Sequence, residues 1–481
     1  MQMFDTYVQK LKYMVLREVA RHDYEGTLQD CYLDIPKLIS PGPESTMRCC
    51  IYKERAIVAE RVKMAMGGDK KNDNVIEVIG IACDECPVSG YRVGPDCRGC
   101  IAHRCQAACP RGAISFDEKH HAHIDPDKCV NCGKCASVCP YSAIQNHVRP
   151  CERACKVKAI SHTENHYACI DDSKCTACGA CVYQCPFGAI QDKSFLLNAL
   201  KLIRESDHNR NYRVYAVVAP SISSQFVHVK VGQVITALKE LGFCSVIEAA
   251  LGADMVAYKE ARELAEKGFL TSSCCPAFVT FIEKSFPNLK EHISHNYSPM
   301  AELGRFIKRT DPTAKVIFIG PCTAKKAEAQ RENVREHVDC VLTFEELQAW
   351  IDSRDLDLAS LSEGVLDNAS FFGRIFARSG GLSEAVNRRS RSRKSISPSI
   401  HLSATASRNA AWRCSRNSAT CSRRISSRAW PARAAASAAR AASPMAPRTR
   451  AKWTNTATKP WKKPSPTPCV RAVCWMKNKK Y

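Results

Sequence analysis

The chain of 481 residues has no acidic residue in its last part. Residues 388 to 481 contain 23 Lys and Arg but no Asp or Glu, whereas the first 387 residues hold 47 basic and 48 acidic ones. The formal net charge of +22 therefore comes from the tail. Without an excess of positive charge, the rest of the chain is not expected to bind nucleic acid. The tail has few aromatics and no groove-reading Arg pattern, so we expect no nucleic-acid partner there either.

Two further absences concern membranes and export. No apolar run approaches the ~18 residues that a membrane span requires. The opening stretch, MQMFDTYVQKLKYMVLREVARHD, mixes charges throughout and does not have the form of a secretory signal. These features predict a chain without a membrane span in the reducing cytoplasm, where thiols stay free to bind metal.

Cysteine is abundant, and its spacing predicts iron-sulfur clusters. Of the 29 cysteines, 17 fall between Cys83 and Cys185. The C-x2-C-x2-C-x3-C-P run of bacterial ferredoxins occurs as CVNCGKCASVCP at 129–140 and as CTACGACVYQCP at 175–186. A looser copy with a two-residue insertion, CRGCIAHRCQAACP, occupies 97–110. The alternatives are reduced structural cysteines or zinc, which prefers two separated pairs of ligands, often with His.

In such runs three thiolates bind one 4Fe-4S cube and the fourth binds the other cluster of a pair. If the first two motifs pair, one cluster takes Cys97, Cys100, Cys105 and Cys139, and the other takes Cys129, Cys132, Cys135 and Cys109. The motif Cys175, Cys178, Cys181 and Cys185 then needs a distant ligand, for which Cys151 and Cys155 are predicted and Cys83 and Cys86 are also available. The pairing and the number of clusters, from two to four, stay open. Clusters in series conduct single electrons.

From about Tyr212 the pattern alternates between strands and helices. YRVYAVVAPSI at 212–222 and KVIFIGPC at 315–322 are typical of buried strands, and VGQVITALKELGF at 231–243 has helical spacing. We predict an α/β catalytic domain of parallel-sheet βαβ units, preceded by α+β ferredoxin-like domains and followed by a disordered tail. The expected divisions are 1–80, a helical region without an assigned function, 81–200 for the clusters, 211–386 for the incomplete catalytic domain, and 387–481 for the tail.

Two loops of the predicted α/β domain carry cysteine. FLTSSCCPAFV at 269–279 places Cys274 and Cys275 before a proline, and FIGPCTAKKAEA at 318–329 places Cys322 directly after a strand. Together with the ferredoxin motifs, T-S-x-C-C-P and P-C-x-x-K-x-x-E resemble the iron-only (FeFe) hydrogenases over about residues 80 to 386. The PAFV string is similar to monomeric members away from the best-known clostridial type.

The resemblance implies an H-cluster, a 4Fe-4S cube joined through a cysteine thiolate to a diiron centre that bears CO, cyanide and a bridging dithiolate. It implies that Cys275 and Cys322 ligate the cube and that Cys274 is the proton-relay thiol. Lys325 is expected to donate a charge-assisted hydrogen bond to a cyanide, with Glu328 supporting it. Gly320 stands where the better-known type has Met, so the packing above the diiron site cannot be carried over.

The resemblance also implies a proton path. GADMVAYKEARELAEKG at 252–268 matches the path helix of the family, with Glu260 and Glu263 three residues apart on one face. NYSPM at 296–300 offers Ser298 as the hydroxyl between them. The alternative is a solvated helix face.

The function implied is the reversible reduction of protons to H2, with electrons passed through 4Fe-4S clusters. The implied partners are ferredoxin or a similar electron carrier, protons and H2, and maturation machinery for the diiron centre. The alternative is an electron-transfer or redox-sensing iron-sulfur protein with a degenerate, inactive H-cluster domain.

One motif of the family is missing from the printed sequence. After FARSGGLSEAV at 376–386 no E-x-x-x-C-x-x-x-C run follows, although its two cysteines complete the cube. Disorder is one interpretation of the tail, since its composition buries little apolar surface. A shifted reading frame is another. Joining the third base of each codon to the first two of the next around 425–440 permits NFIEGMACAGGCIGGA, with cysteines where Ala432 and Ala436 stand. The chain as printed is therefore expected to be inactive.

Overall fold

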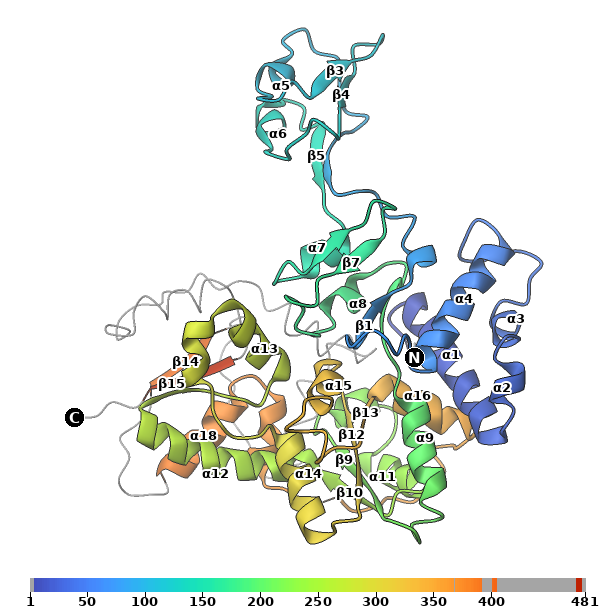
Figure 1. Cartoon of the computed structure of the whole chain (residues 1–481), viewed down its shortest axis with the longest axis vertical. Coiled ribbons are helices and arrows are strands. Elements are labelled where there is room, and N and C mark those ends of the chain that lie inside the picture. Colours follow the sequence, from blue (N-terminus) through green and yellow to red (C-terminus); the bar gives the residue numbers. More distant parts are fainter. Residues whose placement is uncertain (1–3, 367, 392–399, 405–472, 478–481) are drawn as a thin grey trace.

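The computed structural model describes residues 4–366, 368–391, 400–404 and 473–477 (Figure 1). Its N-terminal part is helical, as the sequence predicts. The first helix begins with a capping box between Thr6 and Gln9 and ends at the left-handed Gly26. It packs against the fourth helix and against α9 and α16 of the larger domain. The N-terminal helices are α1 (Tyr7–Glu25), α2 (Leu28–Cys31), α3 (Ile35–Ile39) and α4 (Ile51–Ala65).

The cysteine-rich region consists of two modules of short antiparallel strand pairs and one-turn helices. We call residues 90–147 the outer module, which stands at the top of Figure 1, far from the larger domain. Its elements are β2 (Gly90–Val93), α5 (Arg104–Ala107), β3 (Ile114–Phe116), β4 (Ala122–Ile124), α6 (Lys134–Val138) and β5 (Ile144–His147). Strand β2 pairs with β5, and β3 pairs with β4.

The inner module comprises residues 76–86 and 150–192 and lies between the outer module and the larger domain (Figure 1). Strand β1 pairs with β8, and β6 pairs with β7. Its elements are β1 (Ile76–Val78), η1 (Gly80–Ala82), α7 (Pro150–Ala154), β6 (Ile160–His162), β7 (Ala168–Ile170), α8 (Ala180–Gln184) and β8 (Ile190–Asp192).

The larger domain has a parallel four-stranded sheet in the order β10-β9-β12-β13. The predicted strands appear as β9 and β12, and the predicted helix as α11, which confirms the α/β class of this domain. Continuous apolar runs form these strands because helices cover both faces of a parallel sheet. The elements up to the last strand of the sheet are α9 (Leu196–Glu205), β9 (Val214–Val218), α10 (Ile222–Gln225), α11 (Val231–Glu240), β10 (Ser245–Glu248), α12 (Ala249–Lys267), β11 (Phe269–Thr271), α13 (Pro276–Ser285), η2 (Pro287–His292), α14 (Pro299–Thr310), β12 (Lys315–Gly320), α15 (Ala324–Ala329) and β13 (Cys340–Thr343).

The remaining elements are α16 (Phe344–Ser353), α17 (Phe371–Arg374), η3 (Ile375–Ala377), α18 (Gly381–Arg391), β14 (Ile400–Ala404) and β15 (Val473–Lys477). Helices α17 and α18 pack against α12. Strands β14 and β15 form an antiparallel sheet with β11, although the composition predicts no secondary structure there. The stretch 425–440, where a shifted frame restores cysteines, lies outside the described residues.

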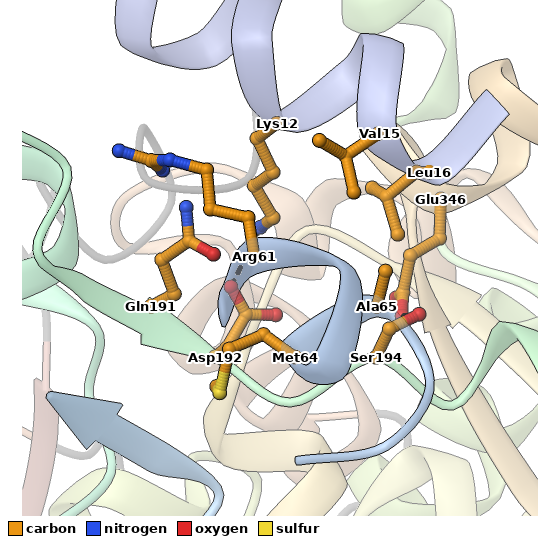
Figure 2. A pocket seen from close by; sticks show the side chains of 10 residues that line it. All are labelled: Lys12, Val15, Leu16, Arg61, Met64, Ala65, Gln191, Asp192, Ser194 and Glu346. Carbon is orange, nitrogen blue, oxygen red and sulfur yellow. Dashed lines mark hydrogen bonds and ion pairs between the residues drawn. The ribbon is translucent and has the colours of Figure 1, made fainter. Parts of the chain in front are cut away.

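A network of buried charged side chains joins the N-terminal helices, the inner module and the larger domain. Lys326 of α15 is fully buried, and its Nζ lies 2.9 Å from Asp192 of β8 and 2.9 Å from Glu346 of α16. Lys12 of α1 pairs with Asp192 at 2.6 Å and with Glu345 at 2.8 Å. Figure 2 shows Lys12 and Asp192 facing each other across this joint. Burial opposes ionisation of Asp192, but Lys12 and Lys326 outweigh it and hold its pKa below the usual range.

Within the described ranges, no helix combines the length and the apolar character that a bilayer crossing demands.

Candidate active site and metal centres

The structure brings together the two predicted cube ligands of the larger domain. Cys275 is the N-cap residue of α13, just beyond β11, and Cys322 follows the end of β12. Burial and the neighbouring Cys275 raise the pKa of the Cys322 thiol to about 12. The two cysteines are therefore neighbours, and a positively charged metal would be needed to hold them as thiolates.

Lys325 lies beside this pair. Its Nζ donates to Glu328 Oε2 at 2.6 Å, to Ser298 Oγ at 2.9 Å and to the carbonyl oxygen of Cys274 at 3.4 Å. The predicted support of Lys325 by Glu328 is thus present as a direct ion pair. The ammonium is fixed next to the cysteine turn, a position suited to an anionic ligand.

Cys274 joins a buried chain of polar side chains through its backbone N–H. Its backbone N–H donates to Ser272 Oγ at 3.2 Å, and Ser272 in turn donates to Glu260 Oε1 at 2.8 Å. Burial raises the pKa of Glu260 to about 7, and it raises that of the Cys274 thiol to about 12. Glu260 Oε2 has no hydrogen-bond partner among the described residues. A carboxyl group poised near neutrality with one free oxygen can accept and release a proton.

Glu263 continues the chain to the surface. Ser294 donates to its Oε2 at 2.8 Å, and the same serine interacts with Glu260. Lys267 and His295 contact Glu263 Oε1 at 2.8 and 2.9 Å, and the His295 side chain is 75% exposed. Burial disfavours the charge on Glu263, but Lys267 and Ser294 outweigh it and lower its pKa. The two glutamates therefore differ in proton affinity along one path.

The placement of Ser298 between the two glutamates is wrong. Ser298 caps α14 and accepts from Lys325, whereas Ser294 donates to Glu263 and lies near Glu260. Both serines lie in the segment between η2 and α14, and only the fold shows that Ser294 faces α12. Ser272 was not foreseen either, because it merely precedes the cysteine turn in sequence.

The outer module brings several of its eight predicted ligands close together. Cys105 interacts with Cys100 and Cys139. A small cavity is lined by the second predicted group, Cys109, Cys129, Cys132 and Cys135. Backbone N–H groups donate to Cys97 Sγ at 3.5 Å and to Cys109 Sγ at 3.3 Å. Such N–H···S bonds stabilise thiolate ligands of iron-sulfur clusters.

The inner module supplies the distant ligand that the last motif requires. A cavity there is lined by Cys155, Cys175, Cys178 and Cys181. Cys83, Cys151 and Cys185 lie in the core of the module, which Cys181 also joins. The cavity lining favours Cys155 as the distant ligand of the Cys175 motif, and the assignment of Cys151 stays a prediction.

The donors in these groups are all cysteine sulfurs, the ligand type of 4Fe-4S cubes. No group of three or more His, Cys, Asp or Glu within the described parts of the chain could hold a single metal ion. A 4Fe-4S cube takes one thiolate at each of four iron atoms, so its ligands stand apart. For the H-cluster, the described residues supply Cys275 and Cys322, and the positions of the remaining two ligands fall outside them.

The inner module touches the active-site loops directly. Thr323 Oγ1 donates to the Ala177 carbonyl at 2.9 Å, and Lys284 Nζ donates to the Cys175 carbonyl at 2.7 Å. The Cys175–Cys178 loop thus lies against the turn that carries Cys322. A cube held by this loop is the nearest one to the pocket.

Comparison with known families agrees with this arrangement. Residues 212–426 match the iron only hydrogenase large subunit, C-terminal domain, 96–143 match a 4Fe-4S dicluster domain, and 168–191 match a 4Fe-4S binding domain. Residues 212–426 are therefore similar to the C-terminal domain of iron-only hydrogenases, and the cysteine-rich modules contain matches to 4Fe-4S domains.

Relatives of this chain fall into two groups. Iron hydrogenase 1 of Clostridium pasteurianum is 32% identical over 33% of this chain and 31% of its own length. The periplasmic [Fe] hydrogenase large subunit of Nitratidesulfovibrio vulgaris is 29% identical over 56% of this chain and 68% of its own. Cytosolic Fe-S cluster assembly factor NAR1 of Kluyveromyces lactis is 39% identical over 20% of each chain. The matched part thus spans about a third of the clostridial relative and a fifth of the yeast one.

Among solved structures, an FeFe-hydrogenase of Chlamydomonas reinhardtii is 24% identical, with a TM-score of 0.37, over 44% of this chain and 66% of that one.

Proposed function

We propose that this chain, with its third cysteine motif restored, reversibly reduces protons to H2 with electrons passed through its 4Fe-4S clusters. Residues 211–386 form the H-cluster domain, where Cys275 and Cys322 hold the cube and Lys325 contacts a cyanide of the diiron centre. When bound, the H-cluster supplies the redox chemistry of protons and H2. The chain's own residues position it and deliver protons.

The observation that carries this proposal is the path from Cys274 to the surface. The Cys274 thiol gives or takes a proton at Sγ, Glu260 exchanges it at its carboxyl oxygens, and Ser294 passes it to Glu263 beside the exposed His295. A protein that only transferred electrons would gain nothing from a buried glutamate with a pKa of about 7, since keeping such a group without a counter-ion lowers stability.

Electrons reach the H-cluster from the side of Cys322, away from the proton path at Cys274. They enter at the outer module from ferredoxin or a similar carrier and pass through the inner module to the turn at Cys322. Named relatives include both a periplasmic and a cytosolic protein, and a cytoplasmic location is the one we propose for this chain. Maturation machinery for the diiron centre is the further partner.

The experiment compares three proteins matured anaerobically: the printed chain, the chain with the frame restored around 425–440, and the restored chain carrying Glu260→Gln. The restored chain is expected to evolve H2 from reduced viologen, and the printed chain is not. Glu260→Gln should lower the rate by about 10²-fold. A restored chain that carries a full complement of iron but evolves no H2 would contradict the proposal.

We propose electron transfer or redox sensing as the alternative function of the chain. The observation that favours it is that the printed chain has Ala432 and Ala436 where the cube needs thiolates. Infrared spectroscopy separates the two functions. Carbonyl and cyanide bands in the restored chain support the hydrogenase, whereas cluster signals in electron paramagnetic resonance without those bands support the alternative.

A further inference from the structure

The two modules repeat each other at a fixed spacing of 46 residues. The register of β3 with β4 pairs Ile114 with Ile124, and that of β6 with β7 pairs Ile160 with Ile170. Residues with positive φ repeat at the same spacing, as in His120 (61°) and His166 (63°). Six pairs of cysteines follow the repeat: Cys105 and Cys151, Cys109 and Cys155, Cys129 and Cys175, Cys132 and Cys178, Cys135 and Cys181, and Cys139 and Cys185.

The repeat fails at the first C-x2-C pair of the outer module. Positions 46 residues beyond Cys97 and Cys100 are occupied by Ala143 and Asn146. A pair with the same spacing, Cys83 and Cys86, occurs 14 residues before Cys97 and Cys100 instead. It follows β1, which pairs antiparallel with β8 just as β2, before Cys97, pairs with β5.

The order of segments shows how the modules are connected. The inner module begins with β1 and the Cys83 pair, breaks off after Cys86, and resumes at α7 with Cys151. The whole outer module is inserted at this break. Figure 1 agrees, since the outer module projects from the inner one and both of its connections return there.

Hydrogen bonds to sulfur place Cys83 in the role of Cys97. The Ala122 N–H donates to Cys97 Sγ at 3.5 Å, and 46 residues later the Ala168 N–H donates to Cys83 Sγ at 3.4 Å. The bond from Ala113 to Cys109 Sγ has its counterpart in that from Ala159 to Cys155 Sγ, at 3.3 and 3.1 Å. The backbone N–H group that donates to Cys97 in the outer module thus has an equivalent in the inner module. That equivalent donates to Cys83, which comes from a distant part of the sequence.

The remaining members of the group are neighbours of Cys83. Cys83, Cys151 and Cys185 are buried in one core cluster, and Cys86 interacts with both Cys185 and Cys83. Arg149 holds the Cys86 loop in place. Its guanidinium donates to the carbonyl oxygens of Cys86 at 3.3 Å and Pro87 at 3.0 Å.

Two buried arginines beside these four cysteines lack a carboxylate partner in the part of the chain that the structure describes, although Asp84, Glu85 and Glu152 also lie near the group. Arg61 is 3% exposed and Arg149 is 2% exposed, and neither pairs with a carboxylate of the described residues. Arg61 Nε and Nη1 and Arg149 Nη1 are buried without a hydrogen-bond partner in that same part of the chain. Figure 2 shows the Arg61 guanidinium turned away from Glu346 and Ser194, and its electrostatic neighbour is Cys185.

Buried cations need an anion close by, because an unpaired buried charge costs several kcal/mol. Four protonated thiols are neutral and cannot supply this negative charge. Four thiolates bound to a 4Fe-4S cube can supply it, since such a cube carries net negative charge when all four cysteines are ionised.

We propose that Cys83, Cys86, Cys151 and Cys185 ligate a fourth 4Fe-4S cluster, with Arg61 as its buried counter-charge. The matched 4Fe-4S domains, 96–143 and 168–191, include neither Cys83 nor Cys86. The chain therefore holds two dicluster modules, one nested inside the other, and all four clusters lie on one route towards Cys322.

The test uses the full printed chain, reconstituted anaerobically, with iron and acid-labile sulfide measured per chain. Cys83→Ala with Cys86→Ala should lose about a quarter of the iron, from about sixteen to about twelve atoms. Cys97→Ala with Cys100→Ala should lose the same share from the outer module. Cys169→Ala is the matched control, because this exposed cysteine is equivalent to His123 and not to a ligand. Unchanged iron in the first variant overturns the proposal.

A second measurement covers the case in which that variant fails to fold. Arg61→Gln keeps all four cysteines but removes the buried cation. One of the four reduction potentials, followed by electron paramagnetic resonance, should become more negative while the other three stay. Four unchanged potentials would likewise overturn the proposal, because Arg61 would then have no cluster beside it.

Discussion

The outer and inner modules share one design and differ in their surroundings. Cys132 of the outer module is exposed, whereas its equivalent Cys178 is half-buried and interacts with Cys175 and Cys155. The inner module ends in Asp192, which is buried between Lys12 and Lys326. The repeat therefore gives the two modules the same ligand geometry. Their surroundings differ, and we expect their roles to differ for that reason. The outer module stands away from the larger domain, and the inner module lies against the turn that carries Cys322.

The largest expected effect is on stability at the inner module's joint. Lys326→Met should lower the free energy of unfolding by about 3–5 kcal/mol, because it leaves Glu346 buried without its cation and Asp192 with Lys12 alone. Chemical denaturation followed by circular dichroism measures this. Lys128→Met is the matched change in the outer module, where the ion pair with Asp125 is exposed, and it should lower the free energy of unfolding far less. Equal effects would remove the distinction between the modules.

A second prediction concerns the two glutamates of α12. Because the pKa of Glu260 is raised to about 7 in the fold, the folded state holds a proton that the unfolded state has lost above its ordinary pKa. Stability should therefore fall as pH rises, by about 2 kcal/mol between pH 5.5 and 7.5. Unfolding of the printed chain at both values measures it.

Glu260→Gln should abolish this loss. Glu263→Gln is the matched control and should retain it, since the pKa of Glu263 is lowered and its contribution is lost only as pH falls. A Glu260→Gln chain with the same pH dependence as the unaltered chain would show that Glu260 is not the group responsible.

The smallest expected effect separates the two serines. In the restored chain, Ser294→Ala should slow H2 evolution about tenfold, because it removes a hydrogen bond to a charged carboxylate on the path. Ser298→Ala should leave the pH profile of the rate unchanged, since Ser298 contacts Lys325 and not the glutamates. If Ser298→Ala changed the pH profile and Ser294→Ala did not, the path would run through Lys325.

Much of this arrangement could be predicted from sequence because its determinants are local. The cysteine runs, the apolar strands β9 and β12, and the turns at Cys275 and Cys322 each depend on a few adjacent residues. Ser294 could not be distinguished from Ser298, because which serine faces α12 depends on the packing of distant elements. The Cys83 pair was one of several possibilities for the same reason, since an inserted module separates it from Cys151 in sequence.

The central claim is that four cubes in two nested modules feed the pocket at Cys275 and Cys322. The most direct measurement is metal analysis of the printed chain after anaerobic reconstitution. The account predicts about sixteen iron and about sixteen sulfide per chain and no zinc. Zinc in place of iron, or about eight iron atoms with the inner cysteines free to react with thiol reagents, would contradict it.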